Sequence, residues 1–269
     1  ESETGKVGVV YPTFEEYPHR LQKEQIVPFF PANKDCRYTA DDLKAFYADK
    51  ELSTLLLINP DNPSGNFIPV PDVLMLAAWC QDHGIRLILD ESFVDFSQDW
   101  ETSSLLDNGI LQAYPNLIVV KSISKSFGVP GLRLGILASA NKELIAQIKK
   151  EVSIWNLNSF AEFFMQIYTK YEKDYKRACE KFQMERTRFY HALSAVPFLR
   201  VIPSEANYFL CEVTDRFSST ELTERLLKDY NILIKDCDTK NGLQDKNYIR
   251  VAVRNTADNN RLVEVLMSL

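Results

Sequence analysis

The sequence predicts an α/β protein whose mainly parallel sheet has helices on both faces, followed by a smaller C-terminal α+β domain. Three observations support this prediction, the first being that apolar runs alternate with helix-like segments in the first half of the chain, as in βαβ units. The runs are continuously apolar, as in strands that are covered on both faces. After Asn141, long helical segments and short strands replace this alternation. We therefore expect a large domain at residues 1–153 and a bridging helix with a small domain at residues 154–269.

The expected elements follow from the spacing of apolar residues and from turn residues. Strands are predicted at Lys6–Tyr11, Ile26–Phe30, Leu55–Asn59, Arg86–Asp90 and Leu117–Val120, and in the second half at Phe198–Ile202, Tyr208–Val213, Ile232–Lys235 and Tyr248–Val253. Helices are predicted at Ala40–Asp49, Val70–His83, Lys142–Val152, Phe160–Leu193 (one long helix with an interruption allowed), Ser219–Asp229 and Thr256–Leu269.

Composition and charge argue against several functional classes. The net charge is −6, and no Lys/Arg cluster is longer than Lys149-Lys150, so nucleic acids and anionic membrane surfaces are not expected as partners. No apolar stretch approaches the roughly 20 residues that span a bilayer, and no signal-peptide pattern is present. The five cysteines are scattered without a CxxC spacing, which favours a reducing cytoplasm, and the presence of three histidines argues against a histidine-rich metal centre.

The stretch from Ser122 to Gly135 has the residues of a site for a phosphorylated aldehyde. Lys125 follows an apolar strand, and a lysine that loses its proton in a pocket can form a Schiff base. Hydroxyls at Ser122 and Ser124, with the guanidinium of Arg133, are groups that hold a phosphate. Pyridoxal phosphate is the obvious candidate. The alternative is a surface loop with one ordinary lysine and one ordinary arginine.

The run Ser122-x-Ser124-Lys125-x-x-Gly128-Val129-x-Gly131-x-Arg133-Leu134-Gly135 resembles the lysine signature of the class I and II pyridoxal-phosphate-dependent aminotransferases, which are fold type I enzymes. The resemblance implies that Lys125 carries the cofactor as a Schiff base and that Ser122, Ser124 and Arg133 lie at its phosphate. Looser similarities at residues 90–96, 155–158 and 249–254 resemble the branch of histidinol-phosphate aminotransferase and threonine-phosphate decarboxylase. They imply that Asn158 lies near the substrate.

Asp90 and Asn62 are the predicted partners of the cofactor ring. A carboxylate at the end of a strand can keep a pyridine nitrogen protonated, although a helix cap or a surface turn is the alternative. The resemblance implies that Asp90 pairs with the ring nitrogen and that Asn62 bonds the phenolic oxygen. Asn62, Asp90 and Lys125 all follow predicted strands, and sites in parallel α/β sheets lie at the carboxyl ends of strands.

Three aromatic residues complete the expected cofactor site. The resemblance implies that Phe14 stacks on the cofactor and that Tyr17 supports Asp90, although an aromatic residue after a strand more often belongs to a core. Phe93 departs from the family pattern, because many relatives have tyrosine there. Since phenylalanine cannot bond the phenolic oxygen, we expect a higher pKa for the Schiff base.

Arg250 is the predicted ligand of a substrate carboxylate. A guanidinium fork matches a carboxylate, and strand alternation would put Arg250 and Arg254 on the same face. Two solvated surface arginines are the alternative. The resemblance favours Arg250, and it leaves the role of Arg254 open.

The expected activity is transamination between a small amino acid, phosphorylated or not, and a 2-oxo acid. One alternative is decarboxylation of an amino-acid phosphate, since the bond that stands perpendicular to the cofactor ring is not fixed by the sequence. Another is a non-catalytic aminotransferase-like module of a larger protein. Family members have an arm and a phosphate-binding glycine loop before the equivalent of Pro12-Thr13-Phe14. We therefore expect this chain to be part of a longer polypeptide that forms a homodimer. Whether this chain binds the cofactor by itself is left open by the sequence.

Overall fold

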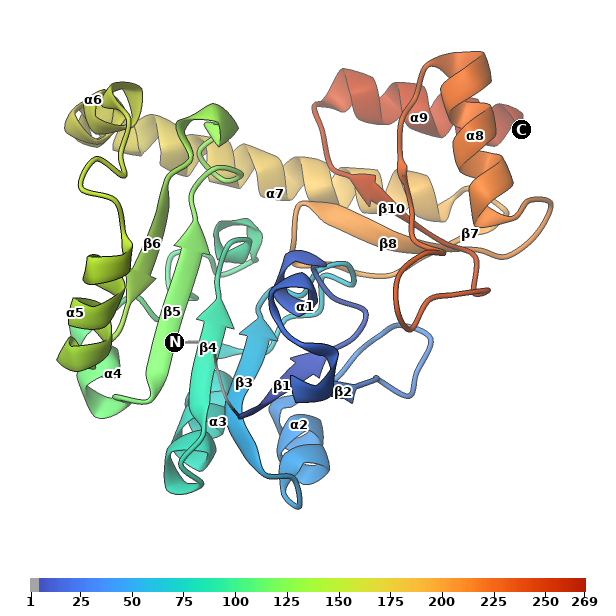
Figure 1. Cartoon of the computed structure of the whole chain (residues 1–269). Coiled ribbons are helices and arrows are strands. Elements are labelled where there is room, and N and C mark those ends of the chain that lie inside the picture. The colour runs from blue at the N-terminus through green and yellow to red at the C-terminus, as the bar shows by residue number, and fades with distance from the viewer. Residues whose placement is uncertain (1–4) are drawn as a thin grey trace.

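A computed structural model describes residues 5–269 of the chain. It contains two sheets (Figure 1): a six-stranded sheet in the order β2-β1-β3-β4-β5-β6 and a four-stranded sheet in the order β7-β8-β10-β9. The predicted α/β fold with a smaller second α+β unit is confirmed. The predicted domain boundary at residues 153–154 falls between helices α5 (Lys142–Glu151) and α6 (Ser159–Ile167) and stays a prediction.

The first sheet is parallel except at one edge. Its strands are β1 (Lys6–Val10), β2 (Ile26–Phe29), β3 (Leu52–Ile58), β4 (Arg86–Asp90), β5 (Leu117–Ser122) and β6 (Gly135–Ala138). Among the strands that the structure describes in this sheet, β6 alone pairs antiparallel, with β5. Strand β6 was not predicted, because its four residues directly follow the glycine-rich loop and are too few to show a strand pattern.

Helices α2 and α3 cover one face of this sheet. The helical elements of the first half are α1 (Glu16–Arg20), η1 (Lys23–Gln25), α2 (Ala40–Tyr47), α3 (Val70–Asp82), η2 (Val94–Phe96), α4 (Asn108–Ala113), η3 (Pro130–Leu132) and α5 (Lys142–Glu151). A capping box formed by Thr39 and Asp42 begins α2. The six-residue α4 was not predicted, because it is too short for a clear helical period.

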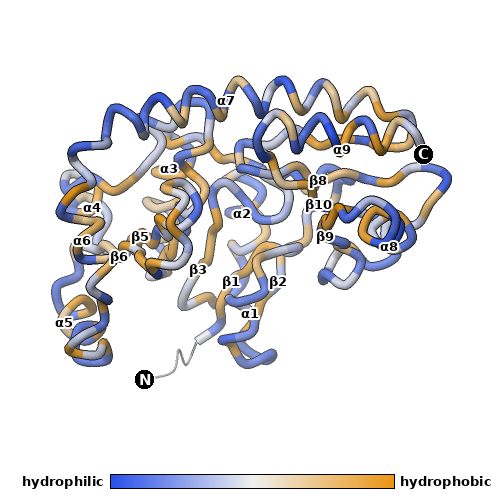
Figure 2. The backbone as a smooth tube through the Cα atoms, turned by 90° about the horizontal axis from the view of Figure 1, so that it is seen from above, coloured by the Kyte–Doolittle hydropathy of each residue, from blue (hydrophilic) through white to orange (hydrophobic). Residues whose placement is uncertain are grey.

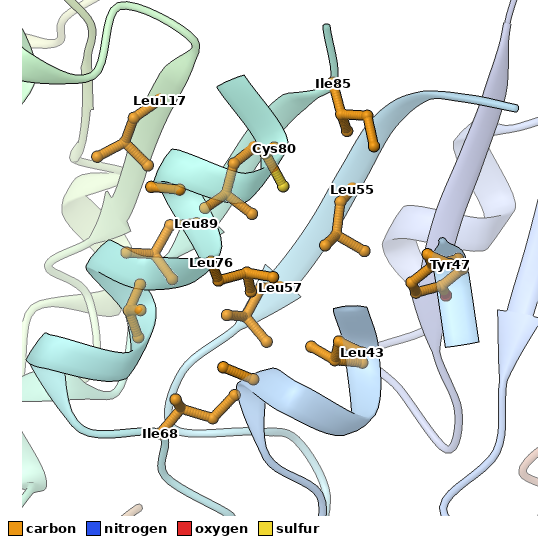
Figure 3. Packing of buried hydrophobic residues seen from close by; sticks show 14 of the residues in the cluster. Leu43, Tyr47, Leu55, Leu57, Ile68, Leu76, Cys80, Ile85, Leu89 and Leu117 are labelled. Carbon is orange, nitrogen blue, oxygen red and sulfur yellow. The ribbon is translucent and has the colours of Figure 1, made fainter. Parts of the chain in front are cut away.

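Alternate residues of the strands face opposite sides of the sheet. Leu55 and Leu57 of β3 belong to the larger core, where they pack with Leu76 of α3 and other apolar side chains (Figure 3). Leu56 faces the other side, in a smaller cluster packed against Tyr17 and other residues near α1. The larger core therefore anchors the strands and fixes the loops that follow their carboxyl ends.

A long helix connects the two sheets. The segment predicted as one helix with an interruption divides into α6 (Ser159–Ile167), η4 (Tyr168–Tyr171) and α7 (Glu172–Ser194). In Figures 1 and 2, α7 runs along both sheets. Its Gln183 donates to the carbonyl of Ser97 in the first half at 2.8 Å, while its Glu185 accepts from Asn259 of α9 at 2.7 Å. Within residues 5–269, no helix is long and apolar enough to cross a membrane.

The second sheet is entirely antiparallel and has its own core. Its elements are β7 (Leu199–Val201), β8 (Tyr208–Val213), α8 (Ser219–Tyr230), β9 (Lys235–Asp236), β10 (Tyr248–Ala252) and α9 (Thr256–Ser268). The strand predicted at Ile232–Lys235 is wrong except for its last residue. The amide of Ile232 donates to the carbonyl of Leu226 and so completes the end of α8, and Ile234 packs on the core from a loop.

Candidate active site

The carboxyl ends of β3, β4 and β5 meet at one edge of the first sheet. Asp90, the last residue of β4, pairs with Ile58 of β3 and with Val120 of β5. Asn62 follows β3, and Lys125 follows β5. Asp90 and Asn62 are buried. The sheet register therefore places these loops next to one another, as expected from the sequence.

Two neighbours fix the carboxylate of Asp90. The hydroxyl of Tyr17 donates to Oδ2 at 2.6 Å, and the amide of Ser92 donates to Oδ1 at 2.8 Å. Burial and the nearby negative charge of Asp90 both raise the pKa of Tyr17, so its hydroxyl stays protonated and remains a donor. The structure thus places Tyr17 where it can support Asp90, and the role of both residues toward a cofactor stays a prediction.

The amine of Lys125 lies among the charged residues that the sequence singled out. Partial burial lowers the pKa of Lys125, Asp90 acts in the opposite direction, and the positive charges of Arg133 and Arg250 lower it further. The Nζ atom lies 4.8 Å from the centre of the Phe93 ring. A lowered pKa favours the neutral amine, which is the nucleophile needed to bind an aldehyde.

The loop after β5 brings hydroxyls and amides together beside Lys125. The amide of Ser124 donates to Oγ of Ser122 at 3.4 Å, and the amide of Ser122 donates to Oγ of Ser92 at 3.0 Å. Arg133 has a left-handed backbone, with φ at 56°, and donates to the carbonyl of Pro130 at 3.3 Å. Because a guanidinium has several N–H donors, Arg133 can also bind an anion such as a phosphate.

Arg250 and Arg254 have different surroundings. Nη1 of Arg250 donates to Oδ1 of Asn62 at 2.7 Å, and its guanidinium lies 4.9 Å from the centre of the Tyr208 ring. Arg254 lies outside β10, is exposed, and pairs with Asp258 at 2.8 Å. Of the two arginines, Arg250 is the one that contacts the predicted site.

Phe14 and Asn158 lie at the border of this region. The Phe14 side chain is 44% exposed and meets Tyr17 edge-on, with ring centres 6.1 Å apart. Oδ1 of Asn158 accepts from the amide of Ala161 and caps α6, while Nδ2 donates to the carbonyl of Leu132, both at 3.0 Å. Asn158 therefore fixes the start of α6 beside the loop of Arg133, and its contact with substrate stays a prediction.

Tyr208 and Asp61 lie beside the candidate site and were not predicted from the sequence. The ring of Tyr208 lies edge-on to Phe93 with centres 5.1 Å apart, and its hydroxyl donates to the backbone carbonyl of Asp61 at 2.7 Å. Tyr208 was predicted as the start of a strand. Its neighbours depend on how the two sheets face each other, and no local sequence signal reveals this.

These groups fit pyridoxal phosphate. An amine with a lowered pKa suits the aldehyde, and two hydroxyls with a guanidinium suit the phosphate. A buried carboxylate that accepts two hydrogen bonds suits a protonated ring nitrogen. The amide nitrogen of Asn62 suits the phenolic oxygen, since its oxygen already accepts from Arg250.

Comparison with known proteins identifies the family. The model of aminotransferase class I and II matches residues 4–266. The chain belongs to this family. Membership confirms the resemblance carried by the lysine signature, and it confirms pyridoxal phosphate as the cofactor. The individual roles of the site residues remain predictions.

Several relatives belong to the predicted branch. The chain is 31% identical to the L-serine phosphate decarboxylase of Sulfurospirillum multivorans, over 100% of this chain and 69% of that protein. It is 34% identical to the threonine-phosphate decarboxylase of Salmonella typhimurium, over 81% of this chain and 58% of that protein. The solved histidinol-phosphate aminotransferase of Clostridium acetobutylicum has a TM-score of 0.87 and 27% identity, over 98% of this chain and 77% of that one. The chain spans only 42% to 69% of the length of four curated relatives, although each match covers nearly all of this chain.

Proposed function

We propose that the protein is a pyridoxal-phosphate-dependent decarboxylase that removes the α-carboxylate of a small amino-acid phosphate. The main support is the similarity to L-serine phosphate decarboxylase along the whole chain. The grouping of Lys125, Asp90, Asn62 and Arg250 adds to it, because these residues supply the amine, carboxylate, amide and guanidinium that such chemistry needs. The comparisons thus favour the alternative from the sequence analysis over transamination.

Arg250 is proposed to bind the carboxylate of the substrate. Asn62 holds one nitrogen of its guanidinium at 2.7 Å, and the Tyr208 ring supports its face. A guanidinium held in this way keeps further N–H donors for a carboxylate without having to reorganise. The direction in which Arg250 holds the carboxylate decides which bond of the α-carbon is aligned for cleavage.

Lys125 is proposed to hold the cofactor and to carry a proton. When bound, pyridoxal phosphate accepts electrons from the α-carbon of the substrate. Asp90 holds the proton of the pyridine nitrogen, and Tyr17 and Ser92 keep the carboxylate in place. The amine of the substrate would first displace Lys125 from the cofactor, and Nζ would take up the proton that this amine gives up. As carbon dioxide leaves, Nζ would donate that proton to the α-carbon, so the electron pair of the broken C–C bond ends in a new C–H bond. The products are carbon dioxide and the corresponding amine.

Transamination is the second candidate. The family model and the similarity to a histidinol-phosphate aminotransferase favour it. In that reaction Lys125 removes the α-hydrogen of the amino acid and the product is a 2-oxo acid. The same residues serve both reactions, so the candidates differ in the bond that is broken rather than in the groups present.

Product analysis distinguishes the two reactions. Protein loaded with cofactor is incubated with serine phosphate or threonine phosphate and with a 2-oxo acid as amino acceptor, and carbon dioxide, the amine and the 2-oxo acid of the substrate are measured. Equal amounts of carbon dioxide and phosphorylated amine are expected, and Lys125→Ala should abolish both. The 2-oxo acid of the substrate without carbon dioxide would replace the proposal with transamination. If the complete protein develops no absorbance of bound cofactor when pyridoxal phosphate is added, a non-catalytic module would be favoured.

The setting of the enzyme is also proposed. All five cysteines are buried and free, which supports a reducing, cytoplasmic location. Small molecules are the proposed partners: an amino-acid phosphate, or an amino acid with a 2-oxo acid in the second candidate. A homodimer is proposed for the complete protein. Light scattering of the complete protein at several concentrations would test the dimer, and a constant monomer mass would contradict it.

A further inference from the structure

We propose that Lys240 is a positioning residue that ties the β9–β10 hairpin, which carries Arg250, to the segment that carries Phe14. Through this tie, a movement of the carboxylate-binding arginine is passed to the aromatic ring predicted to stack on the cofactor. The inference rests on the proposed roles of Arg250 and Phe14, and it goes further by assigning a coupling function to a lysine outside the lysine signature.

The ammonium of Lys240 is buried and bonds to the residues on both sides of Phe14, to the backbone of one and to the side chain of the other. Lys240 is only 6% exposed. Its Nζ donates to the carbonyl of Thr13 at 2.7 Å and to Oε1 of Glu15 at 2.8 Å. A buried cation is costly unless hydrogen bonds and a counter-charge compensate it, and here the residues just before and just after Phe14 provide both. Replacing the ammonium therefore removes the anchor on each side of Phe14.

The hairpin holds Lys240 in a fixed place relative to Arg250. The amide of Lys240 donates to the carbonyl of Cys237 at 3.0 Å, and its carbonyl accepts from the amide of Leu243 at 2.9 Å. Cys237 and Leu243 are fully buried. Across the hairpin, Arg250 pairs with Lys235. The turn and the strand of Arg250 are thus one packed unit.

A second contact holds the hairpin against the same part of the chain. Gly242 has a φ of 90°, and a Cβ at this position would lie 3.1 Å from the Phe30 ring. Phe30 in turn stacks on Tyr11 with ring centres 5.6 Å apart. The turn therefore lies closely against residues just before Phe14, so Lys240 reaches a segment that is already adjacent.

Movement of the Phe14 segment would also reach the cofactor-binding carboxylate. Phe14 meets Tyr17 edge-on, and the Tyr17 hydroxyl donates to Asp90 at 2.6 Å. Binding of a carboxylate at Arg250 would pull on the hairpin, and Lys240 would transmit the displacement to Phe14 and Tyr17. When substrate binds, the Phe14 ring and the hydrogen bond between Tyr17 and Asp90 would then shift together.

The first test needs no cofactor. In Lys240→Met, hydrogen exchange of the Tyr17 amide, which donates to the Phe14 carbonyl at 3.3 Å, should speed up about tenfold. Lys246→Met is the matched control, because this exposed lysine of the same turn donates to the turn's own Gly242 carbonyl. The control should leave this exchange rate unchanged, and Lys240→Arg should largely restore the slow exchange of the wild type.

Equal exchange rates of the Tyr17 amide in Lys240→Met and wild type would overturn the proposal. If Lys240→Met does not fold, Glu15→Gln serves instead and should give a smaller increase in the exchange rate of the Tyr17 amide.

The second test is a double-mutant cycle on cofactor affinity. Lys240→Met should weaken binding of pyridoxal phosphate about tenfold in the wild-type background but less than about twofold in a Phe14→Ala background, because coupled residues are not additive. Additive losses would show that Lys240 stabilises the protein without acting through Phe14. If this chain binds no cofactor, the exchange experiment alone decides. Neither readout depends on whether carbon dioxide or a 2-oxo acid is formed, so failure of the proposed reaction would be seen separately.

Discussion

Nη1 of Arg250 donates a hydrogen bond to Oδ1 of Asn62 across 2.7 Å, and this contact joins β10 of the second sheet to the loop after β3 of the first. An asparagine amide has one acceptor oxygen and a nitrogen with two donors. Since the oxygen is engaged by Arg250, the nitrogen remains to donate to the phenolic oxygen of the cofactor. One side chain would then contact both the carboxylate-binding arginine and the cofactor ring.

Replacing Arg250 by Ala is expected to raise KM for the amino-acid substrate by about 100-fold, because an ionic pair of about 3 kcal/mol is lost. Affinity for pyridoxal phosphate should change far less, since Asn62 keeps its amide nitrogen. Steady-state kinetics and a cofactor titration measure the two effects.

Arg254→Ala is the control for this prediction. Arg254 was expected on the same strand face, but it is exposed and pairs with Asp258. Its removal should leave KM unchanged. Similar KM values for Arg250→Ala and wild type would show that another group binds the carboxylate.

The pKa of the Lys125 amine should respond to its neighbours in opposite directions. Burial is the main cause that lowers it, Asp90 raises it and Arg133 lowers it. Asp90→Asn should therefore lower this pKa further, whereas Arg133→Gln should raise it. In cofactor-free protein, the pH dependence of acylation at Lys125, followed by mass spectrometry, reports the change. Identical profiles for both variants would mean that burial alone sets the pKa.

The substitution Phe93→Tyr tests the departure from the family pattern. Phe93 is buried, and its ring lies near Nζ of Lys125 and near Tyr208. A hydroxyl there that donates to the phenolic oxygen should lower the pKa at which the absorbance of the bound cofactor changes by about 1, the effect of one ordinary hydrogen bond. A spectroscopic pH titration measures it, and an unchanged midpoint would refute the idea.

The parts of the fold that the sequence predicted are those with a local signal. Continuous apolar runs marked the parallel strands, and the groups at their carboxyl ends, Asn62, Asp90 and Lys125, could be brought together by a general rule for such sheets. The Ile232–Lys235 strand failed because an apolar run in a loop can pack on a core as well as a strand can. Edge strand β6 was missed because four residues after a loop carry little periodicity.

The residues missed from the site depend on contacts between distant parts of the chain. Tyr208 reaches Asp61, and Lys240 reaches Thr13, across 147 and 227 residues respectively. Neither contact follows from spacing, because it is set by the packing of the second sheet against the first. Without a family resemblance, Arg250 would likewise have been an ordinary strand residue.

The buried carboxyl of Asp61 should make stability depend on pH. Burial raises the pKa of Asp61 to about 6, against the hydrogen bonds from Ser64 and Tyr38 that favour the ionised form. The folded state thus keeps a proton that the unfolded chain, with a pKa of 3.8, has already lost. The stabilising contribution is fully present below pH 3.8 and is lost as the pH rises through about 6.

Asp61→Asn removes this titration while keeping an acceptor oxygen. The free energy of unfolding of wild type minus that of the variant should fall by about 2 kcal/mol between pH 4 and 6 and by about 3 kcal/mol over the whole titration, since each unit of pKa difference corresponds to about 1.4 kcal/mol. Urea unfolding at several pH values, with each protein compared at the same pH, measures this difference. A difference that stays constant over that range would mean that Asp61 is already ionised in the folded protein, so that its hydrogen bonds outweigh its burial.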